Sequence, residues 1–224
     1  MLKEVLKYLK DNWSFILSIL SIVASFTALV LTAQQTRLNN KQHLFDRRLK
    51  NYKIVMGILS LCKQNYSHID NAISSAQNEP CFYADNLFIW LTNNTYMEKQ
   101  SCAIKQLLEE PAHKEFLIKL EELRDISTEI DLIFNCQVSA KKIGAFILAY
   151  ADALMGLYKY QMIIERMNAE NKKNPMTLEK AQKLVSENSH RNELLEVLRD
   201  LLVKYDAASQ PEVDEELRKQ IALR

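Results

Sequence analysis

The chain has 224 residues, 29 Lys plus Arg against 28 Asp plus Glu, and a formal net charge of +1. This length allows one membrane anchor and one soluble domain of ordinary size. With only three glycines and four prolines, the chain lacks the turn residues that a sheet-rich fold needs about every 8–12 positions, so the composition predicts an all-α fold. Four widely spaced cysteines without a CxxC pair argue against a secreted disulfide scaffold.

The first predicted element is a transmembrane helix over residues 13–33. This stretch of 21 residues runs from Trp13 to Ala33, and no charge occurs between Asp11 and Arg37. A helix of about 20 apolar residues crosses about 30 Å of hydrocarbon. A signal peptide has a shorter apolar core and is followed by a polar mature start, so the run favours a single-pass anchor.

The charges on either side of the span predict its orientation. Residues 34–66 carry seven basic residues and one acidic residue, whereas residues 1–12 carry three basic and two acidic residues. Because the larger basic cluster stays inside the cell, we expect the N-terminus outside and the C-terminal domain in the cytoplasm. Residues 1–12 have the pattern of a short amphipathic helix at the membrane surface. The alternatives are that this segment lies on the cytoplasmic side or simply extends the transmembrane helix.

Small and polar residues form one stripe along the predicted span. Its members are Ser14, Ser18, Ser21, Ser25, Ala28 and Thr32, which follow one another at spacings of 4, 3, 4, 3 and 4 residues. Small residues let helices approach closely in a membrane, and hydroxyls form hydrogen bonds between helices. The stripe therefore predicts a homo-oligomer. In a large oligomer the same hydroxyls would line a pore. Both interpretations stay open, as does the alternative that the stripe has no special role.

Residues 34–78 are predicted to continue the helix as a stalk, because apolar residues keep helical spacing and no breaker occurs before Pro80. Basic residues at its start lie where anionic lipid headgroups attract each cation by about 1 kcal/mol. These residues are Arg37, Lys41, Arg47, Arg48 and Lys50. The pattern favours membrane lipid over nucleic acid as the partner of this segment.

Residues 79–224 are predicted to form a cytoplasmic helical bundle. Trp90 is the expected core anchor of a short apolar piece over residues 87–91. The spacing of Thr95 and Glu98 is that of a capping box and predicts a helix start directly after Thr95.

Four further helices are predicted from Pro111 onward. Pro111 suits the first turn of one helix, and residues 139–168 form the most apolar helix, which we expect at the centre of the bundle. Thr177 is expected to cap a helix that runs to about Tyr205. Pro211 is expected to stand in the first turn of a short last helix.

A second membrane span over residues 143–158 is the alternative for the central helix, since Asp152 is its one charge. These 16 residues are short for a span. We expect Asp152 to be a buried carboxylate that is hydrogen-bonded for structural reasons.

Motifs for catalysis and metal binding are missing from the sequence. It has neither a glycine-rich phosphate loop nor a G-x-S-x-G turn. The histidines are His43, His68, His113 and His190, and none has metal-ligand spacing to another histidine or a cysteine. We therefore expect no enzyme, no metal and no cofactor.

One spacing is similar to a known motif. Arg37 and His43 stand as R-x5-H, which resembles the R-x4–6-H motif of the HEPN ribonucleases. With the N-terminal span and the small helical domain, the chain resembles single-pass membrane effectors of bacterial anti-phage defence, such as the type VI-B CRISPR accessory membrane protein, a pore-forming oligomer with a degenerate HEPN-like domain. The resemblance implies a pore-forming or membrane-perturbing protein of the bacterial inner membrane. The alternatives are a membrane-tethered binding or scaffold module for a cytosolic protein, and a HEPN-like ribonuclease.

Overall fold

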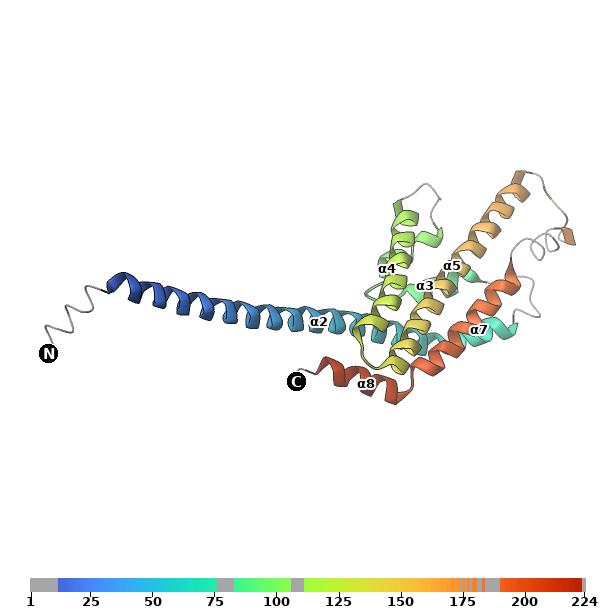
Figure 1. Cartoon of the computed structure of the whole chain (residues 1–224). Helices are drawn as coiled ribbons and strands as arrows, with labels where there is room; N and C mark the ends of the chain where they lie inside the picture. The colour runs from blue at the N-terminus through green and yellow to red at the C-terminus, as the bar shows by residue number, and fades with distance from the viewer. Residues whose placement is uncertain are drawn as a thin grey trace. The chain divides into compact units, whose positions relative to one another are not determined.

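The computed structural model describes residues 12–75, 83–105, 111–173 and 190–222, with a few single positions between 174 and 189. The described residues form helices and no strand, which confirms the predicted all-α fold. Figure 1 shows the helices in chain order. Residues 1–11 of the predicted amphipathic segment, and the predicted domain boundary after residue 78, lie outside the described residues.

The longest helix, α2, runs without a break from Trp13 to Ser75. Contacts within the chain divide it into two units after Asp46. We call the described residues 12–46 the N-terminal unit and residues 47–222 the packed unit. Helix α2 therefore contributes to both units, and its second half belongs to the packed unit.

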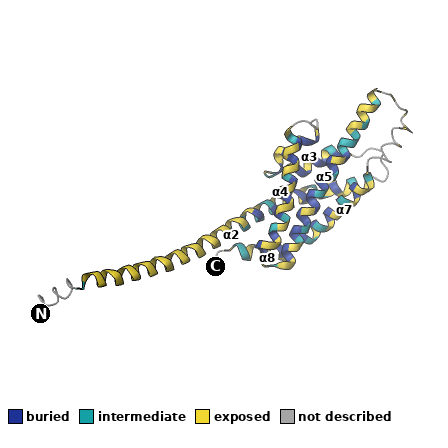
Figure 2. Ribbon diagram, turned by 45° about the horizontal axis from the view of Figure 1, so that its top comes forward, coloured by how far each residue is buried: buried dark blue, intermediate teal, exposed yellow. Residues whose placement is uncertain are grey.

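The N-terminal unit is exposed on all sides. Every described side chain from Trp13 to Leu44 is exposed, including Phe26 at 70% (Figure 2). Helix α2 is long and apolar enough to cross a membrane by length and composition, and none of its most apolar stretch is buried. So large an exposed apolar surface is rare on soluble monomers.

The packed unit contains the second half of α2 and all later elements. These are α3 (Ala84–Thr92), the 3₁₀ turns η1 (Glu98–Gln100) and η2 (Ala103–Lys105), α4 (Pro111–Ile133), α5 (Gln137–Lys173), α7 (Arg191–Ala208) and α8 (Pro211–Ile221). Helix α5 packs against α3, α4, α7 and α8, which is the central place expected for residues 139–168. Its apolar residues between 143 and 158 are mostly buried within the unit, and among the described helices only α2 has the length and composition of a span. The interpretation of residues 143–158 as a second span loses its support.

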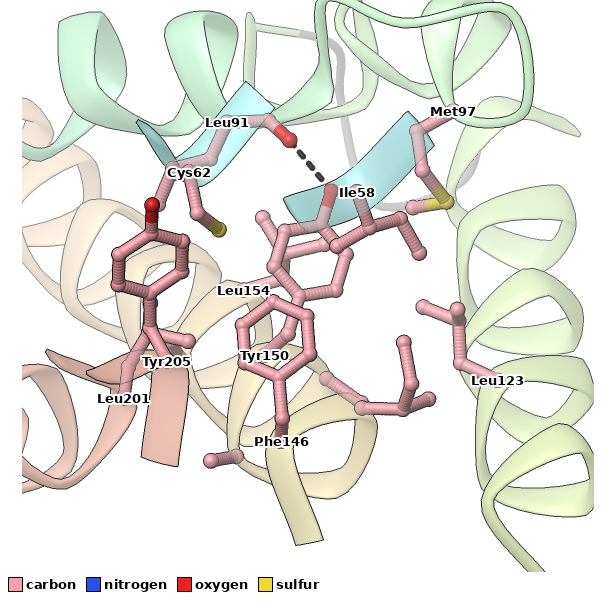
Figure 3. Close-up of a cluster of buried hydrophobic side chains, with 14 of the residues drawn as sticks. Ile58, Cys62, Leu91, Met97, Leu123, Phe146, Tyr150, Leu154, Leu201 and Tyr205 are labelled. Carbon is pink, nitrogen blue, oxygen red and sulfur yellow. Dashed lines mark hydrogen bonds between the residues drawn. The ribbon is translucent and has the colours of Figure 1, made fainter. Parts of the chain in front are cut away.

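Side chains from several helices meet in the core (Figure 3). Ile58 and Cys62 of α2 lie in one buried cluster with Tyr150 of α5 and Tyr205 of α7. Tyr150 is fully buried, and its hydroxyl donates a hydrogen bond to the carbonyl of Leu91 in α3. This bond satisfies a polar group that would otherwise be costly to bury. The second half of α2 is thus part of the core.

The expectation for Trp90 is wrong. Its side chain is 41% exposed, and its ring packs on that of His68 with centroids 4.5 Å apart. Phe88 and Leu91 are fully buried instead. Because Trp90 is two residues after Phe88, it points about 200° away round the helix. The short helix therefore buries its phenylalanine face.

The helix expected directly after Thr95 is also absent from the described structure. The side-chain oxygen of Asn94 accepts hydrogen bonds from the backbone N–H groups of Tyr96 and Met97, at 2.9 and 2.8 Å. Asparagine favours such local turns. The short turns η1 and η2 follow, beginning at Glu98 and Ala103.

The last two helices begin differently from one another. The helix predicted from Thr177 to about Tyr205 is described as α7 from Arg191 onward, and most residues before position 190 lie outside the described part. His190, its N-cap, has φ of 49°. Helix α8 begins with Pro211 in its first turn, as predicted.

Candidate functional site

The predicted polar stripe lies on the N-terminal unit with its side chains exposed. Its polar members are Ser14, Ser18, Ser21, Ser25 and Thr32. The hydroxyls of Ser18 and Thr32 donate hydrogen bonds to carbonyls four residues earlier, at 2.9 and 2.8 Å, which satisfies them within their own helix. Ser21 and Ser25 form no side-chain hydrogen bond with the described residues, so their hydroxyls can bond to another helix.

The stripe continues beyond the apolar run at the same spacing. Gln35, Asn39 and Gln42 follow Thr32 at intervals of 3, 4 and 3 residues, and all are exposed on α2. Alternation of 3 and 4 is the heptad spacing that keeps one line of contact between two helices. We call the whole set from Ser14 to Gln42 the extended polar stripe. The three amides lie outside the apolar run, so hydropathy does not include them in the stripe. The spacing of 3 and 4 residues is the signal in the sequence that finds them.

The residues predicted to contact lipid fall into two groups. Arg37 and Lys41 are exposed in the N-terminal unit, about one and two turns past Ala33. Arg37 lies two residues from both Gln35 and Asn39, so it points about 200° round the helix from them. Lys41 lies two residues from Asn39 and one from Gln42, so it points about 200° and 100° from them. These two cations can contact headgroups while the stripe faces another helix. Lys50 is exposed in the packed unit.

Arg47 and Arg48 are held by acceptors within the packed unit. Arg47 forms an ion pair with Glu129 of α4. The guanidinium of Arg48 donates hydrogen bonds to the carbonyls of Ile133, at 2.6 Å, and Gln220, at 3.2 Å. Carbonyls at helix C-termini lack partners and carry partial negative charge. Arg48 therefore joins the ends of α4 and α8.

Arg37 and His43 do not converge within one chain. Both are exposed on α2, and six residues place them about 120° apart round the helix and about 9 Å apart along it. Over the described ranges of the chain, no cluster of three His, Cys, Asp or Glu side chains could hold a metal ion.

His113 forms a polar pair inside the core. Its ring nitrogen Nδ1 shares a hydrogen bond with the hydroxyl of Tyr158, and both residues are buried. Burial raises the pKa of Tyr158, so the phenol stays protonated at neutral pH. Phe116 packs on the same tyrosine ring with centroids 5.0 Å apart. The pair is a satisfied part of the core.

A groove of about 700 Å³ lies along α5 and α7 in the packed unit, with Arg124 contributed by α4. Its apolar lining is formed by Met155, Gly156, Met162, Ile163, Leu194 and Val197. Small-molecule sites occupy about 300–1,000 Å³ and combine an apolar lining with a few polar groups. The groove has the size and composition of such a site.

Charged side chains line the same groove. Asp152 forms an ion pair with Arg124 at 3.1 Å, and the ring of His190 lies 3.0 Å from a carboxylate oxygen of Glu193. The side chain of Asp152 is 47% exposed, so its predicted hydrogen bonding is present but its predicted burial is wrong. Lys159 is exposed and has no hydrogen bond or ion pair to another described residue.

Comparison of this chain with family models, with curated proteins and with solved structures finds no match. The function must therefore be argued from the extended polar stripe and the groove themselves.

Proposed function

We propose that residues 13–33 anchor this protein in a membrane, that it self-assembles through the extended polar stripe, and that the assembly perturbs the membrane as an effector. One observation carries the proposal. On a helix exposed on all sides, small and hydrogen-bonding side chains recur at heptad spacing from Ser14 to Gln42, with no charge among them.

Self-association explains the stripe better than lipid contact does. Hydrocarbon gives no advantage to hydroxyls in register, whereas a hydrogen bond between helices in a membrane contributes about 0.6–2 kcal/mol. Parallel copies of one chain place Ser21 at the same depth in every copy, and Asn39 likewise. A polar residue at such a position is a known means of fixing register and subunit number.

The number of subunits decides what the stripe does. In a dimer it is buried between two helices, whereas in a closed ring its hydroxyls can face a water-filled lumen. A ring is the form that permeabilises a membrane, which is the activity that the resemblance to anti-phage effectors implies. In either form Arg37 and Lys41 remain free to contact anionic headgroups.

The first test is the subunit number of the full-length protein in detergent, measured by light scattering on a sizing column. The variant Ser18→Leu/Ser21→Leu/Ser25→Leu should lose assembly and any release of ions from loaded vesicles. The matched control is Thr27→Leu. Thr27 lies outside the stripe, and its hydroxyl donates a hydrogen bond to the Val23 carbonyl at 2.8 Å. Intact assembly in the triple variant would overturn the proposal.

The second test is disulfide cross-linking in membranes. Asn39→Cys should form a dimer under mild oxidation, because equivalent stripe positions face each other in a parallel pair. Arg37→Cys is the control on the opposite face of the helix, and the unmodified chain gives the background of the native cysteines. Equal cross-linking at both positions would contradict contact through the stripe.

The anchor is tested by the mass of the protein recovered from membranes. An uncleaved N-terminus supports a transmembrane helix, whereas loss of about 30 residues would identify a signal peptide. The groove on α5 and α7 supports a second candidate, a membrane-tethered binding module. A monomeric or dimeric protein that releases no ions from vesicles would favour that candidate.

A further inference from the structure

We infer that the groove along α5 and α7 binds an anionic single-chain amphiphile of the fatty-acid class, with its acidic group at Lys159 and its chain along the apolar lining. This binding site is separate from the extended polar stripe and does not depend on self-assembly.

The lining of the groove suits a flexible chain. Met155, Met162 and Val197 pack against the core and are only partly buried, so they present apolar surface to the groove. Methionine side chains adapt their shape to different ligands. The lining residues of α5 run from Asp152 to Ile163, which is about 16 Å of helix at 1.5 Å per residue. An extended acyl chain matches this long, narrow form better than a compact ring system does.

The charges in the groove favour an anionic head group. Asp152 is engaged by Arg124, and Glu193 is engaged by the ring of His190. Lys159 is the one basic side chain of the groove for which the described residues offer no acceptor. Its ammonium group has three hydrogens to donate, and a charge-assisted bond to a carboxylate is about twice as strong as a neutral one. The unused cation therefore selects an acid over an alcohol.

Two backbone features shape the groove. A Cβ atom at Gly156 would lie 3.0 Å from a methyl carbon of Leu194, so the glycine lets α5 and α7 approach closely there. His190 has a left-handed backbone with φ of 49°, which is a strained conformation for a residue other than glycine. Such strain occurs at ligand sites more often than elsewhere, and the imidazole of His190 is part of the groove lining.

The test uses the full-length protein in nanodiscs of zwitterionic lipid, with laurate as the probe and displacement of a fluorescent fatty acid as the readout. Nanodiscs without protein give the background. Laurate should bind saturably, and dodecanol should bind at least about tenfold more weakly, since a bond to a charged group is worth about 1.5 kcal/mol or more. Lys159→Glu should weaken laurate binding by a similar factor and leave dodecanol binding unchanged.

Two further variants complete the test. Lys141→Glu makes the same charge change on an exposed residue of α5 outside the groove and should leave laurate binding intact. Val197→Trp should fill the groove and abolish binding of both probes, with thermal unfolding as the check that the protein folds. Displacement no greater than that of empty nanodiscs, equal binding of laurate and dodecanol, or full binding by Lys159→Glu would each overturn the inference. Loss of assembly in the serine variant with laurate binding retained would separate this site from the proposed function.

Discussion

The two halves of helix α2 treat their apolar side chains in opposite ways. In the N-terminal unit Ile22 is 68% exposed, whereas in the packed unit Ile58 is fully buried. In the first half a polar stripe runs through apolar surroundings, and in the second half an apolar stripe runs through polar surroundings. Continuous helical backbone is common to both halves, so the difference in exposure follows from the side-chain pattern.

The largest contrast is expected from the same truncation in each half. Ile58→Ala removes fully buried methyl groups and leaves a cavity, so it should lower the free energy of unfolding by about 2–5 kcal/mol. Ile22→Ala should change it by less than about 0.5 kcal/mol, because its side chain has no contacts to lose within the fold. Urea unfolding of the detergent-solubilised chain, followed by tyrosine fluorescence, measures both. Equal effects would mean that the first half is also covered within the chain.

A new charge should impair membrane insertion when it is placed in the first half of α2 and have no effect on insertion in the second half. Val23→Arg places a guanidinium near the middle of the span, which costs about 2.5–3.5 kcal/mol of insertion free energy. Ser60→Arg adds the same charge at an exposed position of the second half and should leave insertion unchanged. The fraction that remains with membranes after alkaline carbonate extraction reports the result. Normal retention of the Val23 variant would argue against the membrane anchor.

Substitution of one arginine in each half of α2 should have different effects on unfolding and on lipid binding. Arg48→Met leaves the carbonyls of Ile133 and Gln220 without their donor and should destabilise the packed unit by about 1–3 kcal/mol. Arg37→Met should leave unfolding unchanged and weaken attraction to anionic lipid by about 1 kcal/mol. Unfolding curves and vesicle binding at several lipid compositions measure the two effects. An unfolding effect from Arg37 would show that its cation also has an acceptor within the protein.

Alkaline pH should lower the stability of the packed unit through Cys62, which lies in the second half of α2. Burial raises the pKa of Cys62 from 9.0 to about 12, so the folded protein keeps the thiol protonated where the unfolded chain loses its proton. This contribution to stability is complete below pH 9 and declines by about 1.4 kcal/mol per pH unit as the pH rises toward 12. Cys62→Ala should therefore show a shallower alkaline loss of stability than the unmodified chain. Identical slopes would show that the thiol does not contribute.

Much of the fold is predictable from local patterns, because helix starts and apolar spacing act over a few residues. Pro111 begins α4, and the most apolar segment becomes the helix that packs against four others. Trp90 could not be placed this way, since the choice between its face and that of Phe88 depends on partners elsewhere in the chain. The sequence groups Arg48 with the residues expected to contact lipid headgroups. Its acceptors in the fold are the backbone carbonyls of Ile133 and Gln220, which no side-chain pattern reveals.

The extended polar stripe and the groove also differ in how far the sequence alone reveals them. The extended polar stripe lies on one helix, so its spacing can be found in the sequence. The groove combines residues of α4, α5 and α7, and the pairing of Asp152 with Arg124 joins residues 28 positions apart. Such a site appears only when the helices are placed beside one another.

The second half of α2 also imposes an order on synthesis. Tyr66 packs on Tyr205 with ring centroids 5.7 Å apart, and Tyr52 donates a hydrogen bond to Asp214, 162 residues later in the chain. At about 5–20 residues per second, the ribosome needs on the order of ten seconds to make that intervening length. During this interval the apolar side of residues 47–75 lacks the later residues that pack against it in the folded chain. The packing of residues 47–75 is therefore completed only after the last helix, α8, has been made.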